Sequence, residues 1–371
     1  MAFRDAMVSL ACRLLGIPFR LIPRSPSLAI PRSVLIIKPC CIGDVLLATP
    51  VIAALRDAFP EARLDFAVCP WARAMVENNP HLDSIVDCGR VGGGAFPWRE
   101  YLDLVRRIRD RNYDLCFVLA RSPLVTLLPF LAGIPQRVGL DSHGRGFSLT
   151  VRVPVTGVKH EAELYLDTLR AVGIEPEEPT LEFHPLEEDR LVAEGWKLRA
   201  EGKRIVVIHP GGGVNPGMSI SAKRWPPERF SRLADRLIER GMQIVLVGGP
   251  GDKSIAEAVK GAMRNQVLDL TGKLSWGQLG ALLGEADLFI GHDTGAMHLA
   301  VAMRTPVVAI FGPSDPRMYG PYGKGIALWH DVGCNPCFVG GRWKSSCRHF
   351  RCIEAVTVEE VWEAALALLD A

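Results

Sequence analysis

The chain has 371 residues, of which 48% are hydrophobic and 23% charged, and its formal net charge at pH 7 is +2. Because this length exceeds what one hydrophobic core usually supports, we expect two globular domains. The small net charge creates no strong field for nucleic acid, and no apolar run reaches the roughly 18 residues that a membrane-spanning helix needs. The composition therefore favours neither a nucleic-acid-binding protein nor an integral membrane protein.

The first 32 residues differ in pattern from the rest of the chain, and we treat 1–32 as an N-terminal extension. The stretch AFRDAMVSLACRLLG has an apolar stripe at helical spacing, flanked by Arg4 and Arg13, and several prolines then end any continuing helix. A basic amphipathic helix is typical of a segment that lies on a membrane surface. The same pattern suits a helix packed against its own domain, so both interpretations stay open.

From residue 34 onward, apolar runs rich in β-branched residues alternate with helical patterns. Strands are predicted at 34–38, 63–68, 84–87 and 114–120, and helices at 45–58 and 99–112. Continuous apolar strands separated by helices predict a parallel sheet that is covered on both faces. A passage rich in proline and glutamate around 173–190 interrupts this rhythm and indicates the end of a first domain, 33–190.

A second series of the same kind fills the rest of the chain, after a helix predicted at 187–201. Its predicted strands are 205–209, 243–248, 267–270, 287–291 and 306–311, and its predicted helices are 226–240, 252–264, 275–285 and 295–304. The sequence therefore predicts an α/β fold of two Rossmann-like, doubly wound domains facing a cleft, the second over 191–355. We expect the amphipathic helix at 356–371 to cross back to the first domain.

One carboxylate, Asp44, lies where the first predicted strand passes into a helix, in VLIIKPCCIGDVLLATP. A carboxylate there can cap the helix by accepting hydrogen bonds from its first amides. It can equally face a cleft and take a proton from a substrate. The local sequence does not separate these two roles.

A glycine-rich turn comes after the strand at 205–209. Gly211 and Gly212 allow backbone amides to approach a ligand closely, and Lys223 stands just before a helix that Pro226 and Pro227 begin well. Glycine amides with a nearby cation suit a phosphate group, although glycines also serve plain turns. The spacing is not that of a Walker motif.

Asp252 opens a helix after the strand at 243–248. A carboxylate at this position of a dinucleotide-binding fold accepts hydrogen bonds from ribose hydroxyls. Capping of the helix explains it as well.

The strongest candidate is GHDTGAMH, which comes after the strand at 287–291. Asp293, Thr294 and Gly295 open a helix, and His298 lies on its first turn. The first amides of a helix lack intrahelical partners and favour an anion such as a diphosphate. Capping by Asp293 and a buried, hydrogen-bonded His298 are the alternatives, but the combination of these residues favours a functional cluster.

Ten cysteines are present, and six of them lie in the first third of the chain, where free cysteine serves as a small apolar residue. We find no secretory signal, so we expect a reducing cytoplasm rather than a disulfide framework. The other four have the spacing C-x2-C-x9-C-x4-C: Cys334, Cys337, Cys347 and Cys352. Structural zinc, a redox-dependent disulfide and free thiols that pack a loop remain as alternatives, and the short, irregular loops favour free thiols over zinc.

Three absent motifs narrow the chemistry. The chain has no Asp-x-Asp pair to hold Mg²⁺ against a diphosphate, so lysine, amides and a helix dipole must meet the leaving-group charge. It has no G-x-S-x-G esterase motif, and its first strand-to-helix turn lacks the G-x-G-x-x-G of a nicotinamide site. We therefore expect no cofactor.

Four motifs in this order, IGDVLLATP, HPGGG…AKRWPPERF, LTGKLSWGQLGALLGEADLFIGHDTGAMHLA and FGPSDP, resemble glycosyltransferase family 9, the ADP-heptose:lipopolysaccharide heptosyltransferases of Gram-negative bacteria. The resemblance runs from about residue 33 to the end and includes the terminal CNPCF…C…C cluster. It implies a GT-B architecture, with an acceptor-binding first domain and a nucleotide-sugar-binding second domain. It also implies inverting, metal-independent transfer of heptose from ADP-heptose to a lipid-linked inner-core oligosaccharide.

By this resemblance Asp44 is the general base, and Lys223 with the amides after Asp293 stabilises the departing diphosphate. Leu274 falls where the family contacts adenine, and Asp252 lies near the ribose-binding acid. The resemblance implies a cytoplasmic enzyme, with the extension as a candidate peripheral contact with the inner membrane. Another donor or acceptor on the same fold, a nucleotide-sugar epimerase, and a non-catalytic nucleotide-binding module remain as alternatives.

Overall fold

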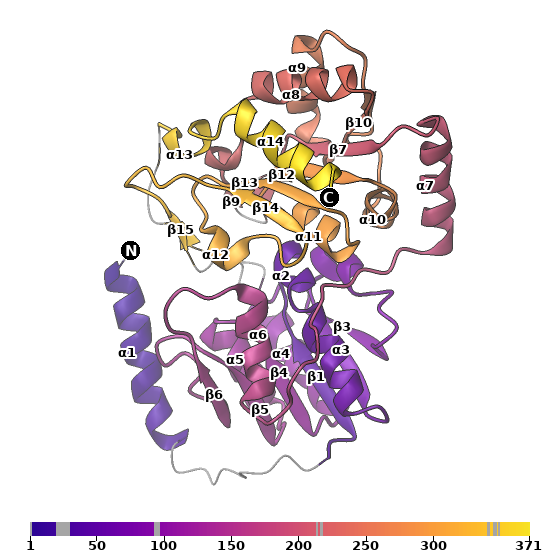
Figure 1. Ribbon diagram of the computed structural model, residues 1–371. Helices are drawn as coiled ribbons and strands as arrows, with labels where there is room; N and C mark the ends of the chain where they lie inside the picture. The colour runs from indigo at the N-terminus through magenta and orange to yellow at the C-terminus, as the bar shows by residue number, and fades with distance from the viewer. Residues whose placement is uncertain are drawn as a thin grey trace. The chain divides into compact units, whose positions relative to one another are not determined.

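The computed structural model describes residues 2–19, 30–92, 97–212, 214–215, 218–339, 342–343, 347 and 349–371. The chain forms two compact units, Met1–Pro179 and Thr180–Ala371. Each unit contains a six-stranded sheet with helices packed on it (Figure 1). The prediction of a two-sheet α/β fold is confirmed.

The sheet of the first unit is parallel throughout and has the order β3-β2-β1-β4-β5-β6. Its strands are β1 (Ser33–Ile37), β2 (Arg63–Val68), β3 (Ser84–Asp87), β4 (Leu115–Val118), β5 (Gln136–Asp141) and β6 (Val151–Pro154). The first four match the predicted strands; β1, β2 and β4 are buried almost throughout, whereas β3 buries only Val86. The last two were not predicted.

Six helices accompany this sheet: α1 (Ala2–Phe19), α2 (Ile42–Leu46), α3 (Thr49–Ala58), α4 (Trp98–Asp110), α5 (Pro123–Leu131) and α6 (Glu161–Arg170), with a 3-10 turn at Pro70–Met75. The predicted helix at 45–58 is two helices, and Pro50 lies in the first turn of α3, where its missing N–H costs nothing. Leu104 and Ile108 of α4 and Leu128 of α5 pack against Leu35 of β1 in one buried cluster.

The sheet of the second unit repeats this topology, with the order β11-β10-β7-β12-β13-β14 and every pair parallel. Its strands are β7 (Ile205–His209), β10 (Gln243–Leu246), β11 (Leu268–Asp269), β12 (Leu288–His292), β13 (Val307–Ile310) and β14 (Gly325–Leu328). Two short antiparallel ladders lie outside it, β8 (Val214–Asn215) with β9 (Met218–Ser219), and β15 (Phe338–Val339) with β16 (Arg342–Trp343). The strand order reverses between β1 and β4, and again between β7 and β12, which are the points where such sheets bind ligands.

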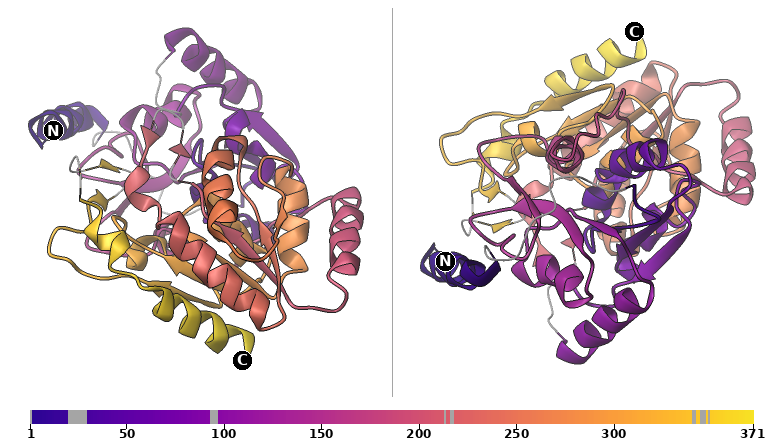
Figure 2. Two further views of the ribbon diagram at one scale, coloured as in Figure 1. Left: turned by 90° about the horizontal axis from the view of Figure 1, so that it is seen from above. Right: turned by 90° about the horizontal axis from the view of Figure 1, so that it is seen from below.

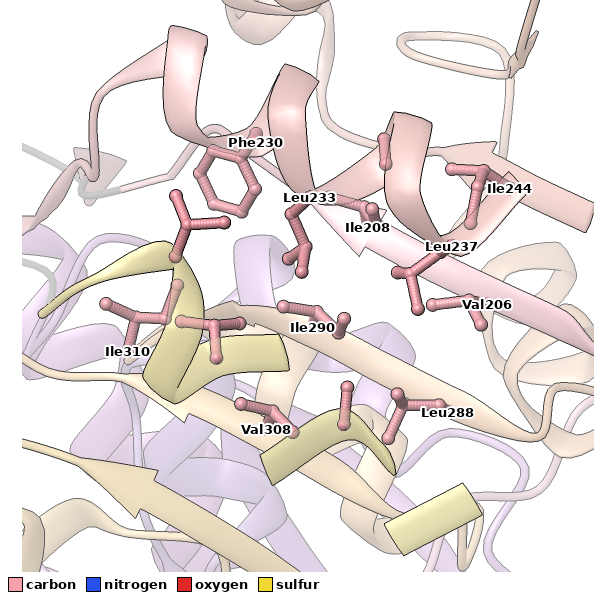
Figure 3. Packing of buried hydrophobic residues seen from close by; sticks show 14 of the residues in the cluster. Val206, Ile208, Phe230, Leu233, Leu237, Ile244, Leu288, Ile290, Val308 and Ile310 are labelled. Atoms are coloured by element: carbon pink, nitrogen blue, oxygen red, sulfur yellow. The ribbon is translucent and has the colours of Figure 1, made fainter. Parts of the chain in front are cut away.

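The helices of the second unit are α7 (Glu187–Arg199), α8 (Pro227–Glu239), α9 (Lys253–Ala262), α10 (Trp276–Gly284), α11 (Gly295–Ala302), α12 (Pro316–Tyr319), α13 (Arg351–Glu354) and α14 (Val358–Leu369), with 3-10 turns at Ser221–Lys223 and Pro250–Asp252. Figure 3 shows Phe230, Leu233 and Leu237 of α8 facing Ile208 and Ile290 of the sheet. This buried cluster fixes the strands whose carboxyl ends carry the candidate site. Among the residues that the structure describes, no helix has the length and apolar character needed to cross a membrane.

The last helix differs from its expected placement. We expected 356–371 to cross back to the first domain, but α14 packs beside α8 and on β12, β13 and β14 of the second unit (Figures 1 and 2). Val361 and Ala365 are fully buried there, in the same cluster as Leu237 and Ile290. The apolar face of α14 is needed to complete the cover of this sheet face, so the helix belongs to the second unit.

The boundary between the units falls after Pro179, inside the proline-rich passage, whereas the sequence pattern placed it at residue 190. The passage up to α7 already packs on the second unit. A Cβ added at Gly280 of α10 would lie 2.4 Å from the ring of Phe183, and one at Gly277 would lie 2.1 Å from the Asp189 carboxylate. These close approaches require glycine on the face of α10 that meets residues 183–189.

Candidate functional site

In the second unit, the carboxyl ends of β7 and β12 lie side by side at the point where the strand order reverses. Gly291 of β12 pairs with His209, the last residue of β7. The loops after these two strands carry the predicted glycine-rich turn and the Asp-Thr-Gly sequence. The fold therefore brings together two candidate segments that are about eighty residues apart in the chain.

A buried ion pair joins Lys223 to Asp293 at this edge. Lys223 Nζ donates to Asp293 Oδ2 at 2.6 Å and to the Asp293 carbonyl oxygen at 3.3 Å, and each side chain is only 9% exposed. Burial alone would raise the pKa of Asp293, but Lys223 and then His298 hold it below its usual value. The site thus holds a fixed lysine cation where β12 ends.

The helix α11 begins directly after this pair. Thr294 is its N-cap and makes no side-chain capping bond, while Thr294 and Gly295 are half-buried. His298, buried on the first turn, places Nε2 4.0 Å from Asp293 Oδ1. The Lys223 cation therefore contacts Asp293, and the N-terminal amides of α11 follow within two residues along the chain, which is an arrangement suited to an anion.

The glycine loop after β7 lies against the same residues. Gly212 has φ +96°, and a Cβ there would lie 2.5 Å from Thr294 Cγ2, so the loop requires glycine at this position. His209 Nδ1 lies 3.4 Å from Thr294 Oγ1. A Cβ on Gly211 would collide with Asp252 at 2.2 Å.

Asp252 connects the two glycine-containing loops. Its Oδ1 accepts from the Gly212 amide at 3.0 Å, its Oδ2 accepts from the Gly249 amide at 2.9 Å, and His209 Nε2 lies 3.4 Å from Oδ2. Burial alone would raise the pKa of Asp252, but His209 and the two amides hold it well below its usual range. Asp252 therefore positions the loops after β7 and β10, and its contact with a ribose stays a prediction.

His292 and Arg224, which were not predicted from the sequence, complete this network. His292 Nε2 accepts from the Trp225 amide at 2.8 Å, and Nδ1–H donates to the Gly211 carbonyl at 3.0 Å. Burial lowers the pKa of His292 to about 3, so the ring is neutral. Arg224 Nε donates to the Gly212 carbonyl at 2.9 Å. The signal available in the sequence for His292 was its place as the polar last residue of an apolar strand, whereas Arg224 directly follows Lys223.

Leu274 lies apart from these residues, on the loop after the outer strand β11. It is half-buried and precedes Ser275, the N-cap of α10, whose side chain forms a capping box with Gln278. The predicted adenine contact stays a prediction.

In the first unit, Asp44 is the third residue of α2, and it pairs with Lys38 at the end of β1. Lys38 Nζ donates to Asp44 Oδ2 at 3.1 Å; the lysine side chain is 9% exposed and the aspartate side chain 31%. The N-cap of α2 is Cys41, without a side-chain capping bond. Asp44 is therefore a partly exposed carboxylate beside a buried cation. Lys38 was missed, although a lysine that ends the buried run Val34–Ile37 was a visible signal.

The four C-terminal cysteines gather in one region of the second unit. The pKa of Cys352 is raised to about 11, chiefly by burial and further by the neighbouring thiols of Cys347, Cys337 and Cys334. A backbone hydrogen bond opposes part of this shift. The structure records all ten cysteines of the chain as free thiols. Across the described residues, no group of three or more His, Cys, Asp or Glu side chains is arranged to hold a metal ion.

Two parallel sheets of the same strand order, each with polar strand-end loops at its reversal point, are the GT-B fold, in which many glycosyltransferases are built. The sequence assigns the chain to one family of these enzymes. It belongs to glycosyltransferase family 9 (heptosyltransferase), whose family model matches residues 101–345.

The comparisons with individual proteins agree with this family. Lipopolysaccharide heptosyltransferase 3 of Escherichia coli (strain K12) is 31% identical over 294 residues, which cover 76% of this chain and 83% of that protein. The solved glycosyl transferase family 9 structure from Veillonella parvula DSM 2008 superposes with a TM-score of 0.79 at 24% identity, covering 92% of this chain and 99% of that one. E. coli heptosyltransferase WaaC with ADP gives a TM-score of 0.67 at 18% identity, covering 91% and 99%. The chain is therefore a glycosyltransferase, and the structural likenesses show the fold.

Proposed function

We propose that this enzyme transfers heptose from ADP-heptose to a hydroxyl of the lipopolysaccharide inner core, with inversion and without a metal ion. Its family membership and the names of its relatives support lipopolysaccharide heptose transfer. The observation that carries the site assignment is the buried Lys223–Asp293 pair at the start of α11. The pair fixes a cation beside helix amides, which is what a departing nucleoside diphosphate requires.

The second unit would bind the donor. As the bond from the anomeric carbon to the diphosphate breaks, negative charge grows on the phosphate oxygen, and Lys223 with the amides of Gly295 and Ala296 would stabilise it. Lysine would thus supply the positive charge that other glycosyltransferases take from a metal ion held by carboxylates. The amides of Gly211 and Gly212 would line the phosphates from the facing loop.

The remaining donor contacts are assigned from position on the same edge of the sheet. We assign Asp252 to the ribose, Leu274 to the adenine, and Thr294 and His298 to the heptose hydroxyls or the phosphate edge. Asp293 would hold Lys223 in place through the 2.6 Å contact.

The first unit would bind the acceptor, with Asp44 as the general base. Lys38 donates to Oδ2 and orients the carboxylate, so Oδ1 would be the oxygen that takes the proton from the acceptor hydroxyl. That hydroxyl oxygen attacks the anomeric carbon from the face opposite the diphosphate, and the configuration inverts as ADP leaves. The acceptor would be lipid-linked, and the reaction would take place at the cytoplasmic face of the inner membrane.

The test is transfer by the Asp44→Asn variant from ADP-heptose to a heptose-deficient core acceptor. We expect kcat to fall by about 10² or more, the usual scale for a general base, with ADP affinity by calorimetry unchanged. The matched control is Asp57→Asn, on an exposed position of α3. NMR of the product should show an inverted anomeric centre, and EDTA should leave the rate unchanged.

Four results would contradict parts of the proposal. Near-normal turnover by Asp44→Asn would remove Asp44 from the mechanism. Retention of configuration would exclude direct displacement. A rate lost to EDTA and restored by Mg²⁺ would refute metal independence, and tighter binding of UDP, GDP or CMP than of ADP would replace the donor.

A further inference from the structure

The helix α1 presents an apolar face to solvent. Met7, Leu10, Leu14 and Ile17 recur at the i, i+3, i+7, i+10 spacing of one helix face, and each is between 51% and 58% exposed. The outward face of a surface helix ordinarily carries charged or polar residues. Here four large apolar side chains occupy it, which marks an interaction surface.

The opposite face of α1 packs on the first unit, so the orientation of the helix is defined. Cys12 is 4% exposed, and a Cβ on Gly16 would lie 3.2 Å from Phe147 Cβ. The Phe19 ring packs edge-to-face on Phe130 of α5 at 4.7 Å and on Phe147 at 5.4 Å. Figure 1 shows α1 along the side of this unit. The exposed apolar face therefore remains after α1 has buried its own packing face.

The charge of this segment indicates what covers the face. Residues 1–32 contain one acid, Asp5, and five arginines: Arg4, Arg13, Arg20, Arg24 and Arg32. The segment thus combines an apolar helix face with an excess of four positive charges, and this combination is complementary to an anionic lipid surface. The whole chain has a net charge of only +2, so the excess is concentrated here.

The helix α7 provides a contrast within the same chain. It also exposes Leu191 at 60% and Leu198 at 81%. However, it carries four acids (Glu187, Glu188, Asp189 and Glu194) against three bases (Arg190, Lys197 and Arg199), so its net charge is −1. Such a helix gains no electrostatic attraction to an anionic surface, so the sign of the net charge distinguishes the two segments, whereas exposed leucines alone do not.

We propose that the face Met7–Leu10–Leu14–Ile17 of α1 is a membrane-docking surface, and that its partner is a bilayer rich in anionic phospholipid. The four side chains enter the boundary between headgroups and acyl chains, and the net positive charge of the segment attracts it to the anionic surface. A helix of 18 residues lies in the plane of that boundary and docks reversibly. The biological reason for docking rests on the proposed function, since a lipid-linked acceptor is held in such a bilayer.

The test is cosedimentation of the full chain with vesicles of phosphatidylglycerol and phosphatidylethanolamine, compared with phosphatidylcholine alone. The test variant is Leu10→Ser/Leu14→Ser, and the matched control is Leu191→Ser/Leu198→Ser. We expect the wild type to bind the anionic vesicles and to bind less to phosphatidylcholine or at high salt. The α1 variant should partition about tenfold or more weakly, and the α7 variant should bind like the wild type.

Two results would overturn the proposal: a wild type that stays in the supernatant, or an α1 variant that binds like the wild type. A dimer in size exclusion that only the α1 variant loses, without vesicle binding, would instead assign the face to a second copy of the chain. All four positions are exposed, so circular dichroism should show that each variant is folded. ADP calorimetry on the same samples separates the outcomes, because a failure to bind ADP would count against the proposed function and leave the docking surface standing.

Discussion

Replacing Lys223 with methionine removes the cation from a pair whose two side chains are each 9% exposed. The Asp293 carboxylate would then be buried without its ammonium partner, and breaking a buried pair in this way typically costs about 3–5 kcal/mol. The neighbouring His298, 4.0 Å from Oδ1, can offset part of this cost when protonated. We therefore expect the free energy of unfolding to fall by an amount near the lower end of that range.

The double variant Lys223→Met/Asp293→Asn separates the role in stability from the role in binding. It removes both charges at similar volume, so most of the lost stability should return. ADP binding should not return, because the lysine that we propose as the diphosphate contact is still absent. A lost charge-assisted hydrogen bond of about 1.5–3 kcal/mol corresponds to roughly 10- to 100-fold weaker ADP affinity.

Urea unfolding followed by far-ultraviolet circular dichroism, together with ADP calorimetry, measures both quantities. Lys324→Met, at an exposed position of the same unit, is the control for loss of a lysine. If the double variant recovers ADP affinity together with stability, Lys223 serves only the fold. If the single variant is as stable as the wild type, the pair is not the buried electrostatic link that the geometry describes.

Two further predictions concern titrating groups. Because the pKa of His292 is lowered to about 3 in the folded chain and is near 6.5 when unfolded, this residue makes stability fall as pH drops below about 6.5, by up to about 1.4 kcal/mol per pH unit. His292→Gln should flatten the wild-type dependence of unfolding free energy between pH 6.5 and 4, and parallel curves would contradict this. The pKa of the Cys40 thiol is lowered by a hydrogen bond from Cys41 and by the charge of Lys38, which together outweigh its partial burial. The pKa of Cys41 is raised by its hydrogen bond with Cys40 and by burial, and that of Cys69 by burial. Iodoacetamide at pH 7 should therefore label Cys40 before Cys41 and Cys69 and slow heptose transfer. The transfer rate of the Cys40→Ser variant should not change on iodoacetamide treatment. Mass spectrometry showing Cys41 modified first would refute the assignment.

The sequence predicts the ranges of β2, β3 and β7 as the structure has them. All residues of β7 and all but the first of β2 are buried, and such a succession leaves a visible pattern of apolar residues, whereas β3 buries only Val86. The strand β5 was missed because Arg137 and Gly139 interrupt its run. The Arg137 guanidinium is buried and donates to the carbonyls of Ser148 and Ile134. These hydrogen bonds offset the cost of burying the guanidinium, and they depend on tertiary contacts that a local sequence pattern does not contain.

In the candidate site, too, the sequence predicted which residues matter better than it predicted their contacts. Motif order pointed to Lys223 and Asp293, and their direct contact required the fold. Asp252 was assigned to the ribose from its place after a strand, whereas its hydrogen bonds run to amides of two loops about 40 residues apart. Lys38 was overlooked because its partner Asp44 becomes a neighbour only when the turn after β1 closes.

The packing of α14 has a consequence for synthesis. The second unit begins at Thr180, yet Val361 and Ala365 complete its buried cluster and the Trp225 indole donates to the Val356 carbonyl at 2.8 Å. Domains generally fold as units during translation, the N-terminal one first. The first unit can therefore fold on the ribosome long before the chain is finished, whereas the face of the second sheet that α14 covers stays exposed until the final residues emerge. Chaperone dependence and sensitivity to C-terminal truncation should accordingly be concentrated in the second unit.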